Sequence, residues 1–152
     1  MNEALKEAIK ASIKLETPIG AVMVKDGKII ARGHNEKELK QDCTLHAEIN
    51  AIRKASHKLG SWRLIDCDMY VTLEPCTMCA GAIIHARVKN LFIGTSDPKA
   101  GAVGLILNVL EIEALNHRVE VVKGVLEYEC SQLLKGFFKS LRVQRASEKK
   151  GK

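Results

Sequence analysis

Two short segments contain the residue types of a metal site, and they strongly limit how the chain can fold. His46-Ala-Glu48 is followed downstream by Pro75-Cys-Thr-Met-Cys79. On a helix, Cys76 and Cys79 would lie on one face, one turn apart. Pro75 suits the first turn of that helix, and a helix N-terminus favours an anionic thiolate. The fold must therefore bring the start of a cysteine helix close to His46.

The three candidate ligands match the chemistry of zinc. Cys76 and Cys79 offer two thiolates and His46 a neutral imidazole, which leaves a fourth position open for water. Zinc lowers the pKa of bound water to about 7. Glu48, two residues after His46, can face the same pocket from the start of a helix and serve as general base. The pattern favours a catalytic zinc site.

Two other readings of the cysteine motif exist. A redox pair is disfavoured because no second C-x-x-C accompanies it and a proline precedes its first cysteine. A structural zinc site needs a fourth protein ligand, and Cys43, three residues before His46, could supply one. Four residues matched together, including Glu48, are more specific than any single one of them. The catalytic reading is therefore preferred.

Composition indicates one soluble cytoplasmic domain. The chain has 152 residues, of which 46% are hydrophobic and 28% charged, as in ordinary globular proteins. Its five cysteines show no disulfide-scaffold spacing, which predicts a reducing compartment. Residues 1–15 alternate charged and apolar side chains, unlike a signal peptide, and no apolar run could span a membrane. We therefore expect no membrane association.

Positive charge is concentrated at the C-terminus. Residues 139–152 contain six Lys or Arg and one acidic residue, a net charge of +5 out of +6 for the whole chain. Such a segment is typical of contact with a phosphate backbone. A solubilising tail would have the same composition, and charge alone does not separate the two.

The order of predicted elements indicates an α/β fold. Apolar periodicity and turn residues predict helices over residues 2–15, 45–58 (with Thr44 as N-cap), 75–87, 105–110 and 127–145, and strands over 19–24, 28–31, 68–73, 90–94 and 119–122. Asp26-Gly27 is a strong hairpin signal between the first two strands. This order predicts a three-layer α/β/α sandwich with one mixed sheet and ligands bound at one sheet edge.

The paired motifs H-x-E and P-C-x-x-C are the signature of zinc-dependent base deaminases. From about Leu5 to Arg142 the chain resembles the cytidine deaminase-like superfamily, and most closely the bacterial tRNA-specific adenosine deaminases (the TadA type). The resemblance rests on the following segments: Pro18-Ile-Gly-Ala-Val, Gly33-His-Asn35, His46-Ala-Glu48, Trp62-Arg-Leu64, Tyr70-Val-Thr-Leu-Glu-Pro-Cys76, Cys79-Ala-Gly-Ala, Ser96-Asp-Pro-Lys-Ala-Gly101, Asn116-His-Arg-Val119 and Phe137-Phe138. Asn116-His-Arg and the Phe-Phe-basic C-terminus separate these enzymes from the cytidine, deoxycytidylate and guanine deaminases.

The resemblance implies a fold and an activity. It implies a five-stranded sheet, a homodimer with active sites near the interface, one zinc ion per subunit and no organic cofactor. The reaction would be hydrolytic deamination of adenosine to inosine at the wobble position of an arginine tRNA, with activated water attacking C6 and Glu48 moving protons. Residues 1–142 would form the deaminase domain and residues 143–152 a basic tail that belongs to the same domain's last helix.

The resemblance also implies substrate-binding residues. Asn35 would contact the base, and the backbone around Ala47 and Pro75 would line the side of the leaving amine. The other positions that match RNA-contacting segments are Asp97, Lys99, Asn116, His117, Arg118, Phe138, Lys139 and Arg142. Aromatic stacking and basic contacts are the physical reasons for such roles. Each position also has a structural explanation, such as core packing for the phenylalanines or a turn at Asp97.

Two departures from the family pattern and two rival functions remain. Residue 43 is usually proline in the family but is cysteine here, and Leu105 stands where serine is common.

The first rival function is that of a deaminase of a free base or nucleotide such as guanine or deoxycytidylate, which has no need of the basic tail. The second is a zinc-stabilised RNA-binding module without chemistry. Glu48 argues against it, because an unused carboxylate beside a metal site costs stability.

Overall fold

The computed structural model describes residues 1–150, with side chains through residue 148. Its sheet has five strands in the order β2-β1-β3-β4-β5. The strands are β1 (Gly20–Lys25), β2 (Lys28–His34), β3 (Cys67–Leu73), β4 (Asn90–Thr95) and β5 (Glu120–Val122). β1 runs antiparallel to β2 and β3, whereas β3, β4 and β5 are mutually parallel. The five-stranded mixed sheet is confirmed.

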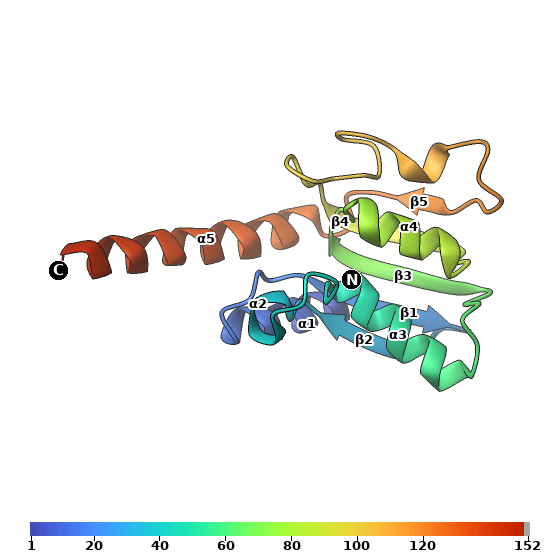
Figure 1. Cartoon of the computed structure of the whole chain (residues 1–152), viewed down its shortest axis with the longest axis horizontal. Helices are drawn as coiled ribbons and strands as arrows, with labels where there is room; N and C mark the ends of the chain where they lie inside the picture. Colours follow the sequence, from blue (N-terminus) through green and yellow to red (C-terminus); the bar gives the residue numbers. More distant parts are fainter. Residues whose placement is uncertain (151–152) are drawn as a thin grey trace.

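Helices cover both faces of the sheet (Figure 1). α3 (Ala47–Leu59) packs on β1 and β2 and contacts α4 (Thr77–His85) on the same face. α1 (Asn2–Ile13) and the start of α5 (Glu127–Lys150) lie on the opposite face. α2 (Lys37–Lys40) and the 3₁₀ helix η1 (Val109–Glu111) lie in connections. The predicted three-layer sandwich is therefore confirmed.

Two glycines allow the helices to approach the sheet closely. A Cβ atom at Gly20 would overlap the backbone oxygen of Ala4 in α1. A Cβ at Gly33 would likewise overlap the backbone oxygen of Ala47, the first residue of α3. Ala4 and Ala47 are themselves fully buried. Gly20 and Ala4 therefore let α1 lie close to β1. Gly33 and Ala47 hold the start of α3 against the end of β2, where the candidate site is built.

One predicted turn is confirmed, and several other predicted elements need correction. Asp26 and Gly27 form the predicted hairpin, with positive φ values of 50° and 70° as a type I′ turn requires. Thr44 is not the N-cap of α3, because His46 takes that position and the Thr44 hydroxyl bonds to Asp42 instead. The predicted α-helix over residues 105–110 is wrong, because residues 105–108 form a loop and residues 109–110 begin η1.

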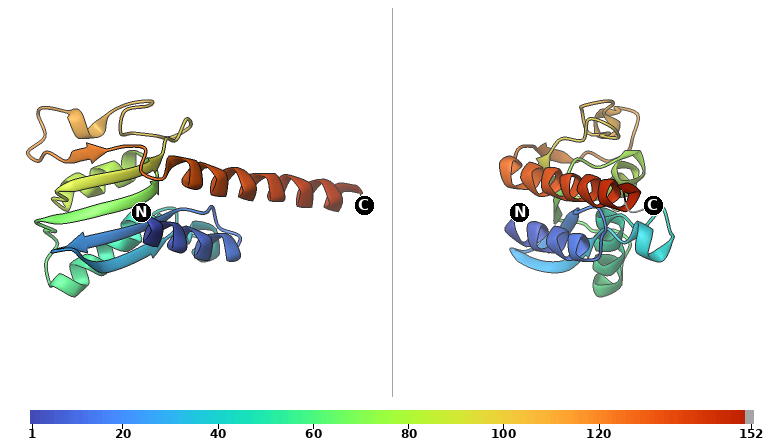
Figure 2. Two further views of the ribbon diagram at one scale, coloured as in Figure 1. Left: turned by 180° about the vertical axis from the view of Figure 1, so that it is seen from behind. Right: turned by 90° about the vertical axis from the view of Figure 1, so that its left-hand side faces the viewer.

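The two ends of the described chain also differ from the prediction. α1 is shorter than predicted, and α5 continues past residue 145 to Lys150 as one 24-residue helix. Residues 151–152 of the predicted tail lie outside the described residues. Figure 2 shows that the second half of α5 projects away from the sheet. Within residues 1–150, no helix is both long and apolar enough to cross a membrane.

Candidate active site

The N-termini of α3 and α4 meet at the edge of the sheet where β3 and β4 end. His46 is the N-cap of α3 and Cys76 the N-cap of α4, both with extended backbone dihedrals. Cys79 follows within the first turn of α4 and is buried. Pro75 precedes the N-cap, so its predicted place in the first helical turn is wrong by two positions. Both helix N-termini point their positive ends at the cluster.

The predicted ligand atoms converge. The Nδ1 atom of His46 lies 3.6 Å from Cys76 Sγ and 3.5 Å from Cys79 Sγ. The three candidate ligand atoms, one from each residue, all lie within 4.8 Å of one another. The set contains one nitrogen and two sulfurs, which are the donor types that zinc prefers, and it leaves a fourth position open. The residues therefore fit a catalytic zinc ion.

Cys43 is not part of this cluster. Its side chain is exposed, and the groups of potential ligands among the described residues do not include it. The structure therefore does not support Cys43 as a fourth protein ligand.

The electrostatics of the cluster favour metal binding. A hydrogen bond from Cys79 lowers the pKa of Cys76 to about 4, so Cys76 is a thiolate at neutral pH. The same hydrogen bond raises the pKa of Cys79, which holds the shared proton. The thiolate of Cys76 also raises the pKa of His46, because it favours the protonated ring. A cation would replace these protons as the positive partner of the sulfurs.

Glu48 is positioned beside the ligands without joining them. Only 4% of its surface is exposed, and it lies in the first turn of α3. Burial raises the pKa of its carboxyl group to about 7. A carboxylate whose pKa lies near neutrality can both accept and return a proton. This arrangement is the one expected of a general base next to activated water.

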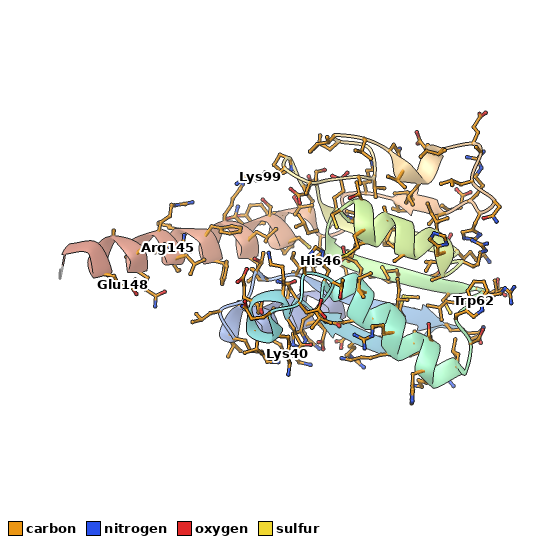
Figure 3. The ribbon with its side chains drawn as sticks, viewed as in Figure 1. Lys40, His46, Trp62, Lys99, Arg145 and Glu148 are labelled. Carbon is orange, nitrogen blue, oxygen red and sulfur yellow. The ribbon has the colours of Figure 1, made fainter. Side chains whose placement is uncertain are left out.

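A pocket of about 420 Å³ opens over His46, a size typical of small-molecule sites. Five predicted site residues line it: Asn35, His46, Asp97, Lys99 and Phe138. Its other lining residues were not predicted from the sequence: Thr17, Ile19, Lys37, Leu73, Thr95, Ser96, Pro98, Ser131, Leu134 and Lys135. Figure 3 shows His46 and Lys99 at the end of the sheet from which α5 projects, with Trp62 at the opposite end.

A buried glutamate that the sequence did not single out orients Asn35. Glu16 is fully buried, and its carboxylate accepts a hydrogen bond of 2.9 Å from Asn35 Nδ2. Its other oxygen accepts one of 2.6 Å from the backbone N–H of Leu39 in α2. Glu16 therefore fixes the pocket wall formed by Asn35 and Lys37. No sequence signal marked it, because both partners are distant along the chain.

The two phenylalanines of α5 face different surroundings. Phe138 lines the pocket over His46 and remains 43% exposed. Phe137 instead lines a groove that includes Ser12 and Leu15, at the end of α1. The two rings still touch edge to face, with centroids 5.5 Å apart. Phe138 is thus available to a ligand, whereas Phe137 helps to dock α5.

The remaining predicted substrate residues lie elsewhere. Ala47 and Pro75 are buried beside the ligands, and the carbonyl of Pro75 accepts a hydrogen bond from the N–H of Ala102. Lys139 and Arg142 follow Phe138 along α5. Asn116, His117 and Arg118 precede β5, and the ring of His117 contacts the carbonyl of Val88 at the start of β4. This segment is therefore at the other end of the parallel strands, away from the pocket of the same subunit.

Comparisons with known proteins agree with the geometry. Residues 1–142 match the model of the MafB19-like deaminase family. A tRNA-specific adenosine deaminase of Bacillus subtilis is 50% identical over 150 residues, which cover 99% of this chain and 93% of that protein.

Two solved structures bear on the choice among deaminases. One, from a study of A-to-I editing by tRNA:A34 deaminases, superimposes with a TM-score of 0.85 at 46% identity and covers 88% of this chain and 97% of its own. A guanine deaminase of Bacillus subtilis superimposes with a lower TM-score of 0.60, at 45% identity, and covers only 62% of this chain and 61% of its own. The chain belongs to the MafB19-like deaminase family and to the family of the tRNA-specific adenosine deaminases.

Proposed function

We propose that this chain deaminates adenosine to inosine hydrolytically at the wobble position of a tRNA, in the anticodon loop of an arginine tRNA. The observation that carries the proposal is the position of Glu48. It is buried next to the His46, Cys76 and Cys79 cluster, and His46 of that cluster lines a pocket bordered by α5. The relationship to tRNA-specific adenosine deaminases supports the choice of substrate.

The chemistry follows from the residues at the site. A zinc ion held by His46, Cys76 and Cys79 would supply activated water at neutral pH. As a water oxygen bonds to C6 of the purine, Glu48 would take up the proton that the water loses and would pass it to the ring nitrogen. Glu48 would then move the proton of the new C6 hydroxyl group to the amine, so that the C–N bond breaks, ammonia leaves and C6 becomes the carbonyl carbon of inosine. Asn35, held by Glu16, would orient the base.

Phe138 provides a stacking surface for a base turned out of the anticodon loop. Replacing it by alanine should raise KM for an anticodon stem-loop about tenfold, because base stacking on aromatic rings is worth ~1–3 kcal/mol. Steady-state kinetics would measure the change. Tyr128→Ala is the matched control, since Tyr128 is 73% exposed on α5 and does not line the pocket. Equal KM values for both variants and the parent would argue against stacking.

The basic end of α5 is proposed to contact the RNA backbone. Deleting residues 144–152 removes four Lys or Arg and one Glu. Binding of the stem-loop should weaken, and its dependence on salt should flatten by ~0.7 in log–log slope for each phosphate that the tail no longer neutralises. Fluorescence anisotropy at several salt concentrations would measure both. A second variant, in which the basic residues of the tail are replaced by glutamine, separates the effect of its charge from that of its length. Unchanged salt slopes in both variants would show that the tail does not contact the RNA.

We further propose a homodimer that works in the cytoplasm. The outer face of α4 carries small and apolar residues that are only half-buried, including Met78 and Gly81, and nothing lies within 4 Å of a Cβ added at Gly81. The nearby loop exposes Leu105, Ile106 and Leu107 by 45–53%. A second subunit would cover such surfaces. Sedimentation of the holoprotein would test whether it is a dimer. In a dimer, Asn116, His117 and Arg118 could contact RNA bound to the partner.

The decisive test compares substrates. The holoenzyme is incubated with an arginine-tRNA anticodon stem-loop, free adenosine, guanine and deoxycytidylate, and products are identified by mass spectrometry. Inosine in the stem-loop alone is the expected result. Conversion of guanine or of deoxycytidylate would replace the tRNA assignment with that of a free-base or nucleotide deaminase. RNA binding with no conversion of any substrate would favour the non-catalytic module.

A further inference from the structure

Another buried glutamate, Glu74, lies between the metal cluster and the wall of the pocket. It follows directly after β3 and precedes Pro75 and Cys76. Only 4% of its surface is exposed, and its backbone N–H donates to the carbonyl of Thr95 at the end of β4. The chemistry proposed above gives it no part. Its carboxylate points instead toward the connection that follows β4.

The carboxylate of Glu74 is enclosed by the 96–105 loop. Its Oε2 atom accepts a hydrogen bond of 3.0 Å from the backbone N–H of Asp97. Its Oε1 atom accepts bonds of 3.0 Å and 3.2 Å from the N–H groups of Val103 and Leu105. One side chain thus ties together both ends of the loop. These N–H groups would otherwise need other acceptors.

The loop is closely fitted to this carboxylate. A Cβ atom at Gly101 would lie 2.5 Å from both the Cδ and Oε2 atoms of Glu74, so a larger residue would displace one or the other. The N–H of Ala102 also donates to the carbonyl of Pro75, next to the ligand Cys76. The loop is therefore bonded to the same turn that carries the metal ligand.

The same loop supplies one wall of the pocket. Ser96, Asp97 and Lys99 line the cavity above His46. Asp97 also folds the loop locally, because its Oδ1 accepts from the backbone N–H groups of Lys99 and Ala100. Anchoring Asp97 therefore sets where Lys99 projects. Glu74 itself does not line the cavity, so it would act on a ligand through these residues.

We propose that Glu74 is a positioning residue that holds the 96–105 loop in register with the metal site, so that the loop can receive the polynucleotide. The proposal rests on the proposed function for its substrate. Glutamine at position 74 has one acceptor oxygen instead of two, so at least one of the three N–H groups loses its partner and meets an amide N–H. The loop should shift or open, while the three ligands remain.

The test uses Glu74→Gln and Gly101→Ala in the zinc-loaded protein, with Glu113→Gln, an exposed glutamate in the segment before β5, as control. We expect KM for the stem-loop to rise about tenfold or more in both variants, with kcat changed by less than about threefold and one zinc per chain retained. Hydrogen exchange should accelerate in residues 97–105 and stay unchanged in α3 and α4. Gly101→Ala leaves Glu74 intact but crowds both its carboxylate and the backbone oxygen of Asp97, so it tests the fit of the loop to Glu74 if Glu74→Gln does not fold.

Each alternative result has a definite meaning. Unchanged KM together with unchanged exchange in residues 97–105 would overturn the proposal. Loss of zinc in parallel with kcat would assign Glu74 to the metal site instead and would overturn it as well. If the parent protein did not convert the stem-loop, the proposed function would fail. The exchange measurement would still decide whether Glu74 holds the loop.

Discussion

Replacing Glu48 by alanine should lower kcat/KM for deamination by at least about 10²–10⁴-fold, the usual contribution of a general acid–base group. Glu48 is buried beside the ligands, and its pKa of about 7 suits it to exchange protons at neutral pH. It is not itself a member of the His46, Cys76 and Cys79 cluster. The variant should therefore keep its metal and its fold. Inosine formation, metal content and circular dichroism would be measured on the same preparation.

Two further variants sharpen this prediction. Glu48→Gln keeps the shape of the side chain but cannot take up a proton, so it should be as inactive as Glu48→Ala. Glu38→Ala is the control, because Glu38 has a side chain 68% exposed on α2. It should behave like the parent. Full activity of Glu48→Ala would exclude the proposed mechanism.

Removing the metal should abolish activity entirely. Without the ion, water at the site returns from a pKa of about 7 toward its bulk value of ~15.7, and almost no hydroxide is available to attack the purine. A chelator should therefore bring turnover below detection, and added zinc should restore it. Cys79→Ser should show the same loss, because it removes a buried ligand from the first turn of α4. Zinc content and turnover would be followed together during the titration.

Cys43 is the matched control for the ligand cysteines. It is exposed and lies outside the cluster, so Cys43→Ser should bind one zinc ion and turn over normally. Loss of zinc from this variant would show four protein ligands and hence a structural site. Recovery of activity in the chelated protein without added metal would contradict the zinc mechanism itself.

The sequence predicted those features whose causes are local. The Asp26-Gly27 turn, the α/β order of elements and the convergence of His46, Cys76 and Cys79 all follow from short segments or from a specific motif. The start of α3 was misplaced for a local reason as well. Thr44 bonds to Asp42 instead of capping the helix, which leaves His46 at the N-cap.

The features that could not be predicted depend on contacts between distant residues. Residues 105–110 have the apolar character of a helix, but Val103 and Asn108 pair as an isolated β-bridge and the N–H of Gly104 bonds to the carbonyl of Leu107, so the chain turns back on itself here. α2 was missed because it is short and because Glu16, far away in sequence, binds the N–H of Leu39. Asn116, His117 and Arg118 match a family segment, but a match does not tell where the segment lies relative to the pocket of its own subunit.

The projecting half of α5 has a consequence for the thermodynamics of binding. Its 24 residues correspond to a length of ~36 Å, and Figure 1 shows that the sheet supports only its beginning. An isolated helix shorter than ~12–15 residues is only marginally stable in water. The last turns of α5 should therefore exchange between helix and coil until a ligand lies along them. Binding of such a ligand would then cost conformational entropy, because these turns become ordered. The enthalpy of binding would become more favourable as the temperature rises, because more of the helix then has to be formed on binding.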